Sequence, residues 1–146
     1  MSRPMRVEAL ERAPYSETVQ VSDYVHQAYM ILLVAFVAAP VLAGLDKFFN
    51  ILTDWPRYLA PIIPTWTGLA ATTFMMIVGA IEIVAGLVVA FKPSFGGYLV
   101  AVWLWGIIIN LLLVPGFYDV ALRDFGLSLG ALALARLAHE FDDYVA

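Results

Sequence analysis

One acidic residue inside a long apolar stretch is the first feature of this sequence that could do chemistry. Glu82 is the single ionisable side chain in residues 67–91. This run is long enough to cross a bilayer, for which about 20 apolar residues suffice. A carboxylate at that depth is costly unless it is protonated, paired or turned toward a wet cavity. Glu82 therefore marks the face of this helix that other helices cover.

Two interpretations of Glu82 stay open at this point. In the functional one it is a proton-relay carboxylate, a charge partner within a complex, or part of a quinone contact with Asn110 and Trp105. In the structural one it is a protonated side chain that bonds to a neighbouring helix, such as the one bearing Asn110. Helical rise places Glu82 about 14 Å and Asn110 about 18 Å from the same predicted membrane edge. We predict no second acid, His or Cys at that depth, which favours the structural interpretation.

Four charged residues are predicted together at the opposite, outer membrane interface. Asp46 and Lys47 end the first predicted span, and Arg123 and Asp124 begin the last. They would either fix two helix ends through salt bridges or line a site for an anionic or quinone headgroup. Because interfacial ion pairs are common structural features, the salt-bridge role is favoured.

Small residues recur at helical spacing in two of the predicted spans. Gly126 and Gly130 form a GxxxG pattern, and Gly79 and Gly86 lie two turns apart. Small residues let membrane helices approach closely, so each pattern predicts a packing face. The partner helix is either internal or part of another subunit.

The sequence offers no complete catalytic or metal-binding motif. His26 and His139 are predicted at one membrane boundary, but neither has a ligand at helical spacing, so no metal site is predicted. The absence of cysteine excludes thiol exchange, thiolate metal sites and thioether haem attachment. We therefore assign no catalytic residue, expect no covalently bound cofactor, and consider catalysis by this chain itself the less favoured alternative.

Composition identifies the class of protein. Hydrophobic residues make up 62% of the chain and charged residues 14%, whereas soluble domains carry about a quarter charged residues. Lipid is the solvent that such a surface needs. A net charge of −4 argues against nucleic acid as a partner. The polar first 24 residues do not resemble a cleavable signal peptide.

The apolar runs predict an all-α, four-helix transmembrane bundle over residues 25–138. The spans are about 25–45, 67–91, 98–114 and 120–137, flanked by a polar arm at 1–24 and an acidic tail at 139–146. Residues 46–64 alternate aromatic and charged side chains and predict an amphipathic interfacial segment. Residues 92–97 predict a tight turn between antiparallel helices.

Four spans place both termini on one side of the membrane. Basic residues on the two sides then number five against three, which favours cytoplasmic termini by the positive-inside tendency. The five are Arg3, Arg6, Arg12, Lys92 and Arg136, and the three are Lys47, Arg57 and Arg123.

Three short motifs resemble those of the DoxX-like (DoxX/DoxD) membrane proteins. They are Gly44-Leu45-Asp46-Lys47-Phe48, Glu82-Ile83-Val84-Ala85-Gly86 and Arg123-Asp124-Phe125-Gly126. The resemblance covers roughly residues 30–138 in order and spacing. The polar arm and the long 46–64 insertion depart from the family pattern.

The resemblance implies a four-helix protein of the bacterial inner membrane that is associated with redox systems. We therefore expect an accessory or anchoring subunit of a larger hetero-complex, in contact with lipid and with other membrane subunits. Two alternatives remain: a quinone-interacting oxidoreductase subunit that uses the Glu82 region, and a small proton or solute transporter. Without cysteine, the thiol-relay role of some family members does not fit this chain.

Overall fold

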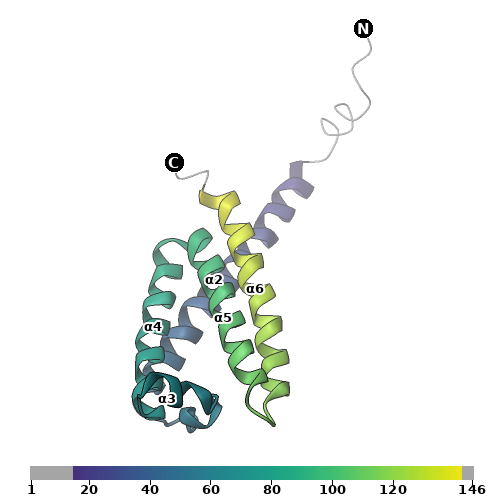
Figure 1. The fold of residues 1–146 in the computed structure, drawn as a ribbon. Helices are drawn as coiled ribbons and strands as arrows, with labels where there is room; N and C mark the ends of the chain where they lie inside the picture. The colour runs from purple at the N-terminus through teal and green to yellow at the C-terminus, as the bar shows by residue number, and fades with distance from the viewer. Residues whose placement is uncertain (1–14, 143–146) are drawn as a thin grey trace.

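A computed structural model describes residues 15–142, and the regular structure in that range is entirely helical. The elements in chain order are α2 (Tyr15–Asp46), the 3₁₀ helix η1 (Trp55–Tyr58), α3 (Ile62–Thr67), α4 (Ala71–Phe91), α5 (Pro93–Leu112) and α6 (Tyr118–Asp142). The predicted all-α class is confirmed. In Figure 1, α2 begins and α6 ends at the same end of the bundle, and α3 lies at the opposite end.

Three of the long helices could cross a membrane by length and composition. They are residues 23–46 within α2, the whole of α4 and the whole of α5. Helix α6 is longer than α5, but it carries several charged side chains and does not meet the same standard. The structure therefore agrees with a membrane protein of several apolar helices. By helix length and composition, however, three helices qualify as spans, whereas four were predicted.

Several predicted boundaries are wrong. Helix α2 begins at Tyr15, so residues 15–24 of the predicted arm are helical, and the rest of the arm lies outside the described residues. Helix α5 begins at Pro93, which leaves only Lys92 of the predicted 92–97 turn outside a helix. Proline suits a first helical turn because its missing N–H would have no intrahelical acceptor there.

The other two boundaries shift for local reasons. Helix α4 begins at Ala71 instead of residue 67, because Gly68 ends α3 with a left-handed backbone, at a φ of 70°. Helix α6 continues to Asp142 and includes the first residues of the predicted acidic tail, whose residues 143–146 lie outside the described range.

Glycines set the closest helix contacts. A Cβ added to Gly79 of α4 would lie 2.5 Å from the carbonyl oxygen of Gly44 in α2, and Gly86 of α4 faces Val41 of α2. The predicted packing face at Gly79 and Gly86 is therefore confirmed, and its partner is α2. Helix α5 approaches α6 in the same way, with Gly97 against the backbone of Ala131.

Apolar side chains lie both inside and outside the bundle. The main core joins the four long helices and includes Phe36, Ala85, Val89, Val100 and Leu134. Large apolar side chains also face outward from every long helix, among them Ile31, Val34, Val84, Val102, Ile109 and Leu122. An outer surface of this kind fits hydrocarbon as the surrounding solvent.

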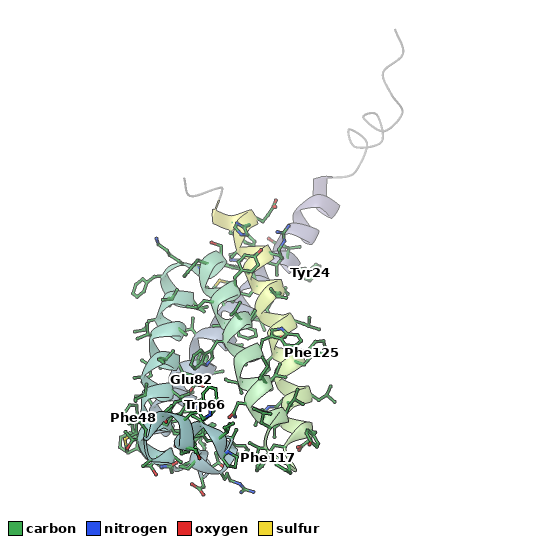
Figure 2. The ribbon with its side chains drawn as sticks, in the orientation of Figure 1. Tyr24, Phe48, Trp66, Glu82, Phe117 and Phe125 are labelled. Carbon is green, nitrogen blue, oxygen red and sulfur yellow. The ribbon has the colours of Figure 1, made fainter. Side chains whose placement is uncertain are left out.

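Residues 47–67, which we call the cap, form a folded segment between α2 and α4. The cap contains η1 and α3 and buries Leu59 and Ala60, while Trp66 is 84% exposed. Figure 2 places Trp66 and Phe48 together at the cap end, below Glu82. The predicted amphipathic segment is therefore a folded structure that packs on α4 and is bonded to the end of α5.

Candidate functional site

The central feature of the site is a salt bridge between Lys47 and Glu82. Lys47 Nζ lies 2.6 Å from Glu82 Oε2, and both side chains are buried. The same ammonium lies 3.7 Å from the ring centroid of Trp55 in the cap, which is a cation–π contact. Glu82 thus bonds to a lysine and not to the helix that bears Asn110, which was the example offered by the structural interpretation.

The close crossing of α2 and α4 explains this pairing. Lys47 follows Gly44 by three residues, and Glu82 follows Gly79 by three residues. Where the two glycines meet, the Lys47 Cβ lies 3.0 Å from the position a Cβ would occupy on Gly79. The lysine side chain then needs to reach only about 4.5 Å along α4, the rise of three residues, to meet the glutamate.

Asp46 organises the beginning of the cap. One of its carboxylate oxygens accepts the backbone N–H of Ile51 at 3.0 Å, and the other accepts that of Leu52 at 3.0 Å and the Trp55 indole N–H at 2.8 Å. Trp55 therefore touches both Asp46 and Lys47. Asp46 and Lys47 were predicted at the outer membrane interface, and the structure shows that both are buried in the protein.

Asp124 brings a second acid to the same region. It is buried on α6 and lies within Coulombic range of both Lys47 and Glu82. Its own neighbour Arg123 approaches Asp124 Oδ1 at 3.3 Å, but the Arg123 side chain is 67% exposed. The expectation that no second acid shares the depth of Glu82 is therefore wrong. The predicted pairing of Asp46 and Lys47 with Arg123 and Asp124 is replaced by the bridges Lys47–Glu82 and Arg123–Asp124.

Asn110 anchors the cap to α5. Its side-chain oxygen accepts the backbone N–H of Ala60 at 2.8 Å, and its amide nitrogen donates to the carbonyl of Tyr58 at 2.7 Å. Both ends of the amide are therefore bonded to the cap backbone. This side chain holds the cap on the bundle and does not face Glu82.

The two tryptophans of α5 have different surroundings. Trp105 is 47% exposed and packs edge-on against Phe125, with ring centroids 5.8 Å apart. Trp103 has a buried indole nitrogen that lies near the Glu82 carboxylate without making a hydrogen bond. The structure thus does not bring Glu82, Asn110 and Trp105 together as the predicted quinone contact. It places Trp103 beside Glu82 instead.

The predicted GxxxG face of α6 is only partly used within this chain. A Cβ on Gly130 would lie 3.1 Å from the Phe36 ring of α2, whereas Gly126 has open space around it. Within α6, Ala131 and Ala135 make the close contacts with α5.

The two histidines pack against aromatic rings. His26 lies 5.3 Å from Phe141 and His139 lies 6.0 Å from Tyr98, measured between ring centroids. Within residues 15–142, no group of three or more His, Cys, Asp or Glu side chains is arranged to hold a metal ion.

Sequence reasoning missed Trp55 and Trp103 as members of the site. Both looked like ordinary membrane aromatics, since nothing in their local sequence shows which charged group they meet. The sequence did contain a signal for the pairing of Lys47 with Glu82. Each follows a glycine by three residues, Gly44 and Gly79 respectively, so a close approach of the two glycines would bring the two charges together.

Fold and site together define a helical protein with three apolar helices able to cross a membrane. A buried ion pair joins one of them, α4, to the residue that directly follows α2. Comparison with known proteins found no matching family model, no matching curated protein and no matching solved structure.

Proposed function

We propose that this chain is a four-span, DoxX-like membrane protein that serves as an accessory or anchoring subunit of a larger electron-transfer complex. One observation supports the anchoring role above the others. Two polar side chains inside the bundle are bonded to partners in the same chain: Glu82 to Lys47, and Asn110 to the cap backbone. Polar groups used in this way hold helices and the cap in place and are not free to bind a substrate.

The fourth span in this proposal is α6. At 25 residues it would be about 37 Å long, enough for a hydrocarbon core of roughly 30 Å. Residues 125–135 carry no charged side chain, and Arg136 and Arg123 lie at either end of this apolar stretch. Asp124 faces the bundle interior, where intramembrane acids usually lie.

The DoxX-like assignment is supported by the way its three motifs converge. Lys47, Glu82 and Asp124 each belong to one of these motifs, and they form one cluster in the fold. Segments far apart in the sequence thus meet through the side chains on which the resemblance rests.

Purification in a mild detergent tests the anchoring role directly. The tagged full chain would be isolated from native membranes, and co-eluting proteins would be identified by mass spectrometry and absorption spectra. We expect stoichiometric haem- or flavin-bearing subunits. A monodisperse, partner-free protein that is active by itself would overturn the proposal.

Two open glycines provide a matched pair of variants for locating the contact. Gly126 on α6 and Gly106 on α5 both have free space around them. If partner subunits pack on the GxxxG face, Gly126→Leu reduces co-elution and Gly106→Leu leaves it unchanged. Equal retention of partners in both variants would show that the contact lies elsewhere.

A further inference from the structure

The buried cluster of Lys47, Glu82 and Asp124 has an unequal charge count. Lys47 is the first residue of the cap, directly after α2, whereas Glu82 comes from α4 and Asp124 from α6; their exposed fractions are 5%, 7% and 5%. Lys47 attracts both carboxylates, and the two carboxylates repel each other. Two buried acids therefore lie near one buried ammonium, while the second cation, Arg123, is mostly exposed.

The charged groups on the surrounding elements compensate this excess only from the surface. Arg123 on α6 reaches only one oxygen of Asp124, at 3.3 to 3.4 Å, and its side chain remains 67% exposed. Adjacent residues of a helix point in different directions, which explains this poor approach. Asp46 of α2 adds a further negative charge and is bonded to neutral N–H groups of the cap.

The cap and α5 do not supply a second buried cation either. Arg57 of the cap is exposed and lies over the Phe117 ring, 5.4 Å from its centroid. Tyr98 is the ionisable residue of α5, and it contacts Arg136 instead of the cluster. An excess negative charge would thus be held in a medium of low dielectric constant, where it is costly.

We propose that the Lys47–Glu82–Asp124 cluster is an intramembrane proton-binding site, which holds one proton shared between its two carboxylates at neutral pH. Binding converts one carboxylate into a neutral carboxyl group, and Lys47 forms the salt bridge with the other. In the observed arrangement Lys47 bonds to Glu82, so the proton is on Asp124. Turning Lys47 to Asp124 moves the proton to Glu82.

Trp103 fits this exchange. Its buried indole N–H is directed toward Glu82 but falls short of hydrogen-bond geometry, so a small movement lets it donate to the Glu82 carboxyl group when Lys47 turns away. An unsatisfied buried donor is costly and calls for an alternative arrangement in which it is bonded. This inference does not rest on the proposed anchoring role.

Infrared spectroscopy tests the site by counting protonated carboxyl groups. The full chain would be measured at neutral pH in dodecyl maltoside, a detergent without ester carbonyls, in H₂O and in D₂O. The carbonyl stretch of a protonated carboxyl group shifts on deuteration and is separate from the amide band. We expect one such group in the wild type, none in Glu82→Gln, none in Asp124→Asn and two in Lys47→Met.

The variants are matched so that each outcome decides the question. In either carboxamide variant the remaining acid has Lys47 to itself and is ionised. Glu140→Gln changes an exposed acid and leaves the count at one. A wild type without the band would overturn the proposal, because all three groups would then be charged. A band that survives either carboxamide substitution would also overturn it, since the proton would not be shared. The number of protonated carboxyl groups in the wild type tests the proposal by itself, even if a variant fails to fold.

Discussion

Substitution of Gly79 by alanine tests whether the crossing of α2 and α4 holds the bundle together. The new Cβ would lie 2.5 Å from the Gly44 carbonyl oxygen, 3.0 Å from the Lys47 Cβ and 3.3 Å from a ring carbon of Phe48. The nearest of these atoms belongs to the backbone, so a rotamer change cannot relieve the contact. The two helices must separate or the chain must shift locally.

A matched substitution isolates the packing contribution. Gly126→Ala makes the same chemical change in the interior of α6, where the Cβ meets nothing within 4 Å. Alanine generally favours a helix over glycine by about 1 kcal/mol, and this gain is common to both variants. The difference between them is then the cost of overpacking, about 1–3 kcal/mol.

The free energy of unfolding would be measured in mixed micelles by titration with a denaturing detergent. We expect Gly79→Ala to be the less stable variant by about 1–3 kcal/mol, and Gly126→Ala to equal or exceed the wild type. Equal stability of the two variants would refute the close crossing and, with it, the geometry that brings Lys47 to Glu82.

Two further predictions concern the ion pair and the cap. Lys47→Met leaves Glu82 without its partner, so the acid must be buried unpaired or take up a proton, and the variant should lose about 3–5 kcal/mol of stability. Lys47→Met combined with Glu82→Leu should recover most of that loss in the same titration. A double variant no more stable than the single one would contradict this account of the pair. Asn110→Ala removes two hydrogen bonds to the cap and should cost about 1–3 kcal/mol and speed proteolysis within residues 47–67. Thr65→Ala, which loses an exposed hydrogen bond within α3, is its control, and equal cleavage of both would count against Asn110 as the anchor.

Patterns local in the sequence were sufficient for much of the fold. Long apolar runs are helices in a membrane because each backbone N–H must be bonded within its own segment. The spacing of Gly79 and Gly86 likewise predicted a packing face, since small residues at helical periodicity allow close approach. Helix ends were less well predicted, as at α5, because a proline after a lysine reads equally as a turn or as a helix start.

The site depended on contacts between distant segments. Lys47 and Glu82 are 35 residues apart. Their pairing requires that α2 end at the level of Gly79, a register that no local pattern specifies. Asn110 looked like a partner for Glu82 on depth alone, but the folded cap offers it the backbone N–H of Ala60 and the carbonyl of Tyr58.

The sequence by itself determined that this is a helical membrane protein with a costly acid in an apolar helix, because composition and periodicity act locally along the chain. Only the tertiary structure decided which groups neutralise that acid. The reason is geometric: the crossing of α2 and α4 at two glycines brings Lys47 to Glu82, and the packing of α6 adds Asp124 to the same buried space.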